Sequence, residues 1–256
     1  MVNRCALFHK MYKYNIKGPF LNILKDMYAS LSCCVKTQSG LGASFETKIG
    51  VKQGCILSPT LFSIYLNDLN SFFDNSCDPV TVDNTYVSSL LYADDIVLIS
   101  KTATGLQSAM NKLGDFCLSW NLSVNISKTK VIIFNKSGRV LKGFSFKYMQ
   151  TEVEIVQEYN YLGIIFRASG VFTQAIKYLC NKALKATFSI KKALAGENMN
   201  TDLYLKVYEH CVKPILLYCS EVLSLDFIVN KDNLISFEHR YDLLQQEKIE
   251  RNRSWV

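Results

Sequence analysis

Apolar residues in the first part of the chain recur at the three- and four-residue steps of amphipathic helices. One stripe runs from Leu7 to Leu31 and is broken at Lys17-Gly18-Pro19, so it predicts two helices joined by a turn. A second helical stripe follows Pro59, because the first turn of a helix tolerates proline, and Ser58 is its expected N-cap.

The middle of the chain has short runs of β-branched and large apolar residues instead. Leu90 to Tyr92 and Ile96 to Ile99 each predict a short strand buried on both faces. Asp94 and Asp95 stand between them, at or beside the turn of the expected hairpin. Further short strands are expected at residues 33–37, 44–49, 130–134, 144–148, 152–156 and 161–166.

Helical spacing returns after the hairpin. An amphipathic helix is expected from Thr104 to Trp120, and the pattern is helical again from Thr173 to Ile215. A boundary near residues 168–171 separates an α+β part from this all-helical part. The polar tail from Asn230 to Val256 is interpreted as a loosely held helix.

The composition indicates a folded, soluble, intracellular protein of the nucleus or cytoplasm. A length of 256 residues with 49% hydrophobic content suits one large domain or two smaller ones. The N-terminus lacks a signal-peptide pattern, and no stretch approaches the ~20 uncharged apolar residues of a membrane span, so no membrane partner is expected. The nine cysteines lack zinc-like spacing and are expected to be buried or free thiols.

The positive charge is concentrated in two places. Between Lys101 and Gln150 there are eight basic residues and one acid, a net charge of +7 that equals that of the whole chain. A second stretch, Thr173 to Gly196, has five lysines and no acid. Such stretches are either ordinary solvated faces or surfaces for a polyanion, and a metal site in the same chain would favour nucleic acid.

The adjacent carboxylates Asp94 and Asp95 suggest a metal site at the expected hairpin. Neighbouring carboxylates repel each other unless a cation neutralises them, and hard divalent ions with oxygen ligands do so best. The alternative is an Asp-rich turn whose side chains bond their own backbone.

Four motifs, taken in order, carry a resemblance to a known family. They are GVKQGCILSP (50–59), LLYADD (90–95), WNLSVNISKTK (120–130) and YNYLG (159–163). Each is weak alone, but their order and spacing resemble the palm of a reverse transcriptase, closest to the LINE-type (non-LTR) retrotransposon family. The Val51-Lys52 spacing favours this branch over group II intron maturases, which share YADD.

The resemblance implies an α+β fold with a right-hand polymerase palm, an antiparallel sheet with packed helices, followed by a helical thumb. The palm with partial fingers would span residues 1–168, the thumb 169–225 and the polar tail 226–256. The implied activity is RNA-directed DNA polymerisation with two Mg²⁺ ions, and the partners are an RNA template, a DNA primer and deoxynucleoside triphosphates.

The resemblance also assigns roles to residues of the palm. Asp94 and Asp95 would be the metal-binding carboxylates, with Asp94 the direct ligand. Tyr92 and Ala93 would line the floor beneath the primer end, although Tyr92 packing in the core is the alternative. The other palm candidates are Gln53 and Gly54 near the template and nascent base pair, where Gly54 is otherwise a plain turn glycine, and Lys128, or alternatively Lys130, at the leaving pyrophosphate.

The remaining roles fall after residue 160. Tyr161, Leu162 and Gly163 resemble the primer grip, a turn that positions the primer backbone. The basic helix from Thr173 to Ala195 would be the thumb, and its lysines, among them Lys177, Lys182 and Lys185, would contact phosphates without reading sequence.

One part of the family pattern is missing. A palm polymerase needs a further carboxylate from a strand beside the YADD hairpin, and upstream of Gln53 only Asp26 and Glu46 are acidic, neither in the family's context. In the family this carboxylate lies in an Asp-bearing block, and Val2-Asn3-Arg4 resembles the residues that follow that block. We therefore expect an N-terminally truncated palm-and-thumb portion with impaired catalysis; the alternative is an inactive nucleic-acid-binding remnant.

Overall fold

The computed structural model describes residues 2–194 and 201–223, which form two compact units. Among the described residues, unit 1 comprises 2–131 with Gly143–Glu154, and unit 2 comprises Ile132–Lys142 with 155–194 and 201–223. Both units combine helices with small antiparallel sheets, which confirms the mixed α and β class. The expected tail, 226–256, lies outside the described residues.

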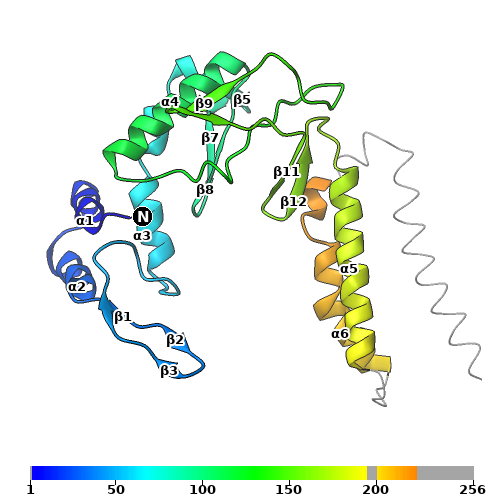
Figure 1. The fold of residues 1–256 in the computed structure, drawn as a ribbon, viewed down its shortest axis with the longest axis horizontal. Helices are drawn as coiled ribbons and strands as arrows, with labels where there is room; N and C mark the ends of the chain where they lie inside the picture. The colour runs from blue at the N-terminus through cyan, green and yellow to red at the C-terminus, as the bar shows by residue number, and fades with distance from the viewer. Residues whose placement is uncertain (1, 195–200, 224–256) are drawn as a thin grey trace, which may run out of the picture. The chain divides into compact units, whose positions relative to one another are not determined.

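Unit 1 begins with the two predicted helices, α1 (Arg4–Lys13) and α2 (Gly18–Ala29) (Figure 1). The Asn3 side chain caps α1 by accepting a hydrogen bond from the Ala6 amide at 3.2 Å. Proline stands in the first turn of α2, where its missing N–H costs nothing. The other helices of this unit are α3 (Ser58–Leu66), η1 (Leu69–Phe72), η2 (Asn75–Cys77) and α4 (Ala103–Ser119).

The strands of unit 1 pair two by two, always antiparallel. An arm after α2 contains the pairs β1–β4 and β2–β3, and almost every residue from 32 to 46 is exposed. The strand bounds are β1 (Ser32–Cys33), β2 (Lys36–Thr37), β3 (Gly40–Leu41), β4 (Phe45–Glu46), β5 (Val80–Val82), β6 (Thr85–Val87), β7 (Ser89–Tyr92), β8 (Asp95–Leu98), β9 (Phe146–Tyr148) and β10 (Thr151–Val153).

The core of unit 1 joins α1, α2 and α3. Leu7 and Met11 of α1 are each 1% exposed, and they belong to one apolar cluster with Leu21, Leu24 and Tyr65. Burying such side chains is the main favourable term in folding. The three helices are therefore held as one body, and this body positions the loop between β4 and α3.

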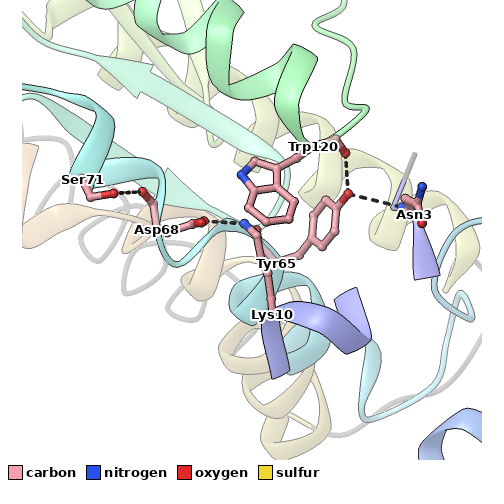
Figure 2. Close-up of polar contacts among 6 residues, drawn as sticks. All are labelled: Asn3, Lys10, Tyr65, Asp68, Ser71 and Trp120. Carbon is pink, nitrogen blue, oxygen red and sulfur yellow. Dashed lines mark hydrogen bonds and ion pairs between the residues drawn. The ribbon is translucent and has the colours of Figure 1, made fainter. Parts of the chain in front are cut away.

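A buried lysine crosses this core (Figure 2). Lys10 is 2% exposed, and its ammonium donates to the Tyr65 carbonyl and to the Asp68 carboxylate. It also lies 3.7 Å from the centre of the Trp120 ring, and the Tyr65 hydroxyl donates to the Trp120 carbonyl. Burial lowers the pKa of Lys10, and the bond to Asp68 opposes that shift. The network ties α1 to α3 and to the end of α4.

The described residues of unit 2 form one hairpin and three helices. Strands β11 (Glu158–Tyr161) and β12 (Ile164–Arg167) pair with each other, and α5 (Thr173–Ala193) is followed by α6 (Thr201–Cys211) and α7 (Lys213–Leu216). Ile164, Ala175 and Leu179 form its core with Leu223. No helix among the described residues combines the length and apolarity needed to cross a membrane.

Several local predictions were wrong. Ser58 is the first residue of α3 rather than its N-cap, and its hydroxyl donates to the Lys52 carbonyl instead. The strands of the Asp-Asp hairpin are not buried on both faces, since Leu90 is 50% and Tyr92 62% exposed. The reason is that, among the residues that the structure describes, β7 and β8 pair only with each other, so no wider sheet there encloses their apolar side chains.

Three predicted strands are also interrupted or absent. Residues 33–37 belong to two separate strands, the end of β1 and β2, rather than to one. Residues 130–134 form no strand beyond a single bridge, in which the Val131 amide donates to the Glu154 carbonyl at 2.9 Å. Residues 161–166 form two strands rather than one. Leu162 and Gly163 have φ values of +49° and +81°, and positive φ at both positions reverses the chain in a two-residue hairpin.

Asp68→Asn should lower the free energy of unfolding of unit 1 by about 2 kcal/mol, because it leaves the buried Lys10 ammonium without its counter-charge. Lys10→Met should cost less, because it removes the charge and keeps an apolar chain of similar length. Urea titration followed by Trp120 fluorescence, in a Trp255→Phe background, measures both. Asp74→Asn, which alters the exposed pair with Lys112, is the control and should change nothing measurable. Equal losses for Asp68→Asn and Asp74→Asn would contradict this account.

Candidate functional site

The four YADD residues lie at the tip of the β7–β8 hairpin. Tyr92 and Asp95 are direct cross-strand partners, so Ala93 and Asp94 form the two-residue turn. Ala93 has a φ of +51°, a left-handed conformation that costs an alanine roughly 1 to 2 kcal/mol. Strain of this kind persists where the surroundings fix the backbone, and it is concentrated at functional sites.

Both carboxylates at this tip are exposed. Asp94 is a turn residue, and Asp95 is the first residue of β8. Their oxygen atoms are the ligand type that Mg²⁺ prefers, so the pair fits a loosely held hard cation. Across residues 2–194 and 201–223, no three His, Cys, Asp or Glu side chains gather closely enough to hold a metal ion. Metal binding by the pair stays a prediction.

The other two residues of the tip, Tyr92 and Ala93, are also accessible to solvent. Tyr92 is 62% exposed, which excludes the alternative that it packs in the core. Ala93 is exposed as well. The tip thus presents an aromatic ring, a methyl group and two carboxylates to solvent.

Gln53 and Gly54 lie in a loop that is fixed on both sides and exposed in the middle. Before them, the Lys52 amide donates to the Tyr28 hydroxyl at 3.4 Å, and the Lys52 carbonyl accepts from Ser58 at 2.5 Å. Gly54 has a φ of +79°, although a Cβ there would touch nothing. The turn therefore needs glycine for its backbone angle, while the open space leaves room for a ligand.

The two candidate lysines differ in their surroundings. Lys130 forms an ion pair with Glu154 at 2.5 Å. Lys128 is exposed on a turn in which its amide donates to the Asn125 carbonyl at 3.1 Å. Lys128 is exposed and Lys130 is half-buried, so the lysine that the motif favours is accessible to a substrate, and its role stays a prediction.

The YNYLG residues of unit 2 form the end of β11 and the two-residue turn that follows it. Tyr161 packs its ring 6.3 Å from that of Phe166 on the opposite strand. The Tyr218 hydroxyl donates to the Leu162 carbonyl at 2.6 Å, and a Cβ on Gly163 would stand 3.4 Å from the Tyr218 ring. A side chain from beyond α7 thus holds the turn in place.

The basic helix α5 buries Ala175, Leu179 and Ala183 and exposes its lysines, including Lys177, Lys182 and Lys185. Sequence reasoning missed three exposed apolar or aromatic residues on this helix, Tyr178 at 40%, Leu184 at 50% and Phe188 at 68%, of which Leu184 and Phe188 lie opposite the buried stripe. Their positions opposite the buried stripe could have been read from the helical spacing. The exposed face is therefore cationic with apolar side chains in between.

The structure places the candidates in two groups. Unit 1 contains the Gln53-Gly54 loop, the hairpin tip and Lys128, and unit 2 contains the β11–β12 turn and α5. Arg4, buried beside the Gln53-Gly54 loop, was not among the sequence candidates, and no local pattern in the sequence marks it.

Comparison with known proteins identifies the family. A family model described as "Reverse transcriptase (RNA-dependent DNA polymerase)" matches residues 2–166, which is more than half of the chain. The chain belongs to this family, as the order of its motifs predicted.

Curated relatives come from mobile elements of the LINE-type, non-LTR kind. The RNA-directed DNA polymerase from mobile element jockey of Drosophila funebris is 27% identical over 183 residues, 69% of this chain and 19% of that protein. The probable RNA-directed DNA polymerase from transposon BS of Drosophila melanogaster is 26% identical over 240 residues, 87% and 25% of the respective chains. The Pol polyprotein from type-2 retrotransposable element R2DM of the same species is 26% identical over 176 residues, 66% and 17%. The chain spans a quarter or less of the length of these relatives.

Proposed function

We propose that this chain carries the palm and thumb portion of a retrotransposon RNA-directed DNA polymerase. The palm with partial fingers spans residues 1–168 and the helical thumb residues 169–225. The observation that carries the proposal is the exposed Asp94-Asp95 pair at a hairpin tip, inside the segment that matches the reverse transcriptase family.

Asp94 and Asp95 are the proposed ligands of divalent metal, Mg²⁺, with Asp94 the direct ligand. When bound, such ions stabilise the attacking and leaving oxygens of nucleotidyl transfer. Tyr92 and Ala93 line the floor beneath the primer end, which their exposure supports. Lys128 donates its proton to the leaving pyrophosphate or balances its charge, and its exposure supports this choice.

The other candidates contact nucleic acid. Gln53 and Gly54 approach the template and the nascent base pair, and the open space around Gly54 supports a close backbone approach. Tyr161, Leu162 and Gly163 position the primer backbone. The exposed lysines of α5 contact phosphates without reading sequence, so the substrates are an RNA template, a DNA primer and deoxynucleoside triphosphates.

A second candidate function is nucleic-acid binding without polymerisation. The observation that favours it is that the hairpin tip presents two carboxylates and that, within the described ranges, no third acid, His or Cys joins them. Primer extension separates the two functions, because both predict hybrid binding and only the first predicts synthesis.

Binding of an RNA/DNA hybrid should weaken steeply with salt and depend little on sequence. If about five phosphates are neutralised, the slope of log affinity against log salt should be roughly −3.5 to −4.5. Replacing Lys177, Lys182 and Lys185 together by Gln should make the slope shallower, lowering its magnitude by about 2 to 3 as measured by fluorescence anisotropy. Replacing Lys13, Lys17 and Lys25 removes the same charge elsewhere and should change it by less than about 1. A flat salt response would contradict the proposal.

Manganese should bind weakly, in the millimolar range or above, because two adjacent carboxylates supply few ligands. Paramagnetic broadening in NMR spectra should centre on the amides of Ala93 and Ile96, and Asp94→Asn should abolish it. Asp83→Asn is the matched control, because Asp83 occupies the turn of the neighbouring β5–β6 hairpin. Broadening that persists in Asp94→Asn would contradict metal binding by this residue and would support the alternative of an ordinary Asp-rich turn.

Primer extension on an RNA template tests the activity. The 256-residue chain alone should extend no primer, because in-line attack needs two fixed ions and one carboxylate pair holds an ion loosely. A fusion with the Asp-bearing block of a family relative should extend it. In the fusion, Asp94→Asn should abolish synthesis with hybrid affinity kept within a few fold, and Lys128→Ala should slow synthesis roughly a hundredfold. Synthesis by the chain alone, or by the Asp94→Asn fusion, would overturn these assignments.

A further inference from the structure

Arg4, the first residue of α1, is buried, and each of its three guanidinium nitrogens donates a hydrogen bond to residues on either side of the β1–β4 arm. It is 8% exposed. Its Nε donates to the Gly50 carbonyl at 2.9 Å, and Nη1 donates to the carbonyls of Thr47 at 2.6 Å and Tyr28 at 3.2 Å. Nη2 donates to the Thr47 hydroxyl and the Ile49 carbonyl, each at 3.3 Å. The guanidinium also lies 5.2 Å from the centre of the Tyr28 ring.

The acceptors lie at the base of the β1–β4 arm. Tyr28 stands just before the arm, and Thr47, Ile49 and Gly50 stand where the chain leaves it, three to six residues before Gln53. One guanidinium thus hydrogen-bonds the segments that enter and leave the arm and holds both of them against α1. Each carbonyl that it satisfies would otherwise lose a hydrogen bond in a partly buried place.

The loop after Gly50 has further attachments to the same body. The Gly50 amide donates to the Val2 carbonyl at 2.7 Å, with the glycine at a φ of +85°. The Tyr28 hydroxyl then accepts from the Lys52 amide, and the Ser58 hydroxyl donates to the Lys52 carbonyl. The backbone is therefore held at residues 50 and 52 and again at the start of α3, while Gln53 and Gly54 remain exposed.

We propose that Arg4 is a positioning residue for the nucleic-acid contact made by Gln53 and Gly54, acting by holding their loop in its binding conformation before substrate arrives. The proposal rests on the proposed function of that loop. A loop ordered in advance loses less conformational entropy on binding, so affinity for the template improves without a new contact. Arg4 itself touches no substrate.

The chemistry requires arginine at this position. The acceptors surround a planar group from several sides, and a guanidinium offers five donors in a rigid fork. A lysine keeps the positive charge but offers three donors from one point. Arg4→Lys therefore separates the geometry of the contact from its charge.

Amide hydrogen exchange of the free chain tests the positioning directly. In Arg4→Lys, the amides of residues 50–55 should exchange about tenfold faster, while those in the middle of α4 keep their rates. Lys13→Arg, an exposed change on the same helix, is the control and should leave both unchanged. Unchanged exchange at residues 50–55 in Arg4→Lys would overturn the proposal.

Hybrid binding tests the functional consequence. The preference of the chain for an RNA/DNA hybrid with a 5′ template overhang over a blunt hybrid should fall about fivefold in Gln53→Ala and by a similar factor in Arg4→Lys, with no further loss in the double variant. Independent, additive losses would overturn the proposal. Failure of the unsubstituted chain to bind any hybrid would instead contradict the proposed function, and the exchange experiment would still decide the role of Arg4 in ordering the loop.

A less disruptive variant, Tyr28→Phe, tests the proposal if Arg4→Lys does not fold. Tyr28→Phe keeps the ring beside the guanidinium and removes only the hydroxyl that accepts from Lys52. It should speed exchange of the Lys52 amide about threefold and reduce the overhang preference in the same direction. A folded Tyr28→Phe chain with unchanged exchange and unchanged preference would contradict the preordered loop.

Discussion

The buried ammonium of Lys10 is the constraint on which unit 1 depends. A charge at 2% exposure is tolerated only where partners replace water, and here the Asp68 carboxylate, the Tyr65 carbonyl and the Trp120 ring do so. Those partners come from the end of α3, the turn after it and the end of α4. Satisfying one charge therefore fixes where three helices meet, which sets the body that the loops extend from.

Arg4 is a second buried cation on α1, and it connects the core to an exposed segment. Lys10 uses its charge to join helices, whereas Arg4, on the same helix, uses its fork to organise carbonyl groups at the base of the arm. The apolar cluster around Leu7 and Met11 holds α1 against α2 and α3, so both cations act from a rigid support. The exposed Gln53-Gly54 loop is thus connected to the core through hydrogen bonds at residues 50 and 52 as well as through the apolar packing of Val51 and Leu57.

Sequence patterns predicted the features that depend on neighbours along the chain. Helical spacing located α1, α2, α4 and α5, and motif order identified the family. The exposure of β7 could not be predicted, because an apolar run looks the same whether or not a wider sheet covers it. Arg4 was missed for a related reason, since its acceptors lie 24 to 46 residues away and leave no local pattern.

The hydrogen bond from Tyr218 to the Leu162 carbonyl links residues 56 positions apart, and this separation matters during synthesis. The β11–β12 turn is translated well before the side chain that secures it. At roughly 5 to 20 residues per second, the ribosome needs about 3 to 11 seconds to add the intervening residues. During that interval the nascent β11–β12 turn lacks the Tyr218 hydrogen bond, so it gains its full set of contacts late on the ribosome, after α5 and α6 have been made.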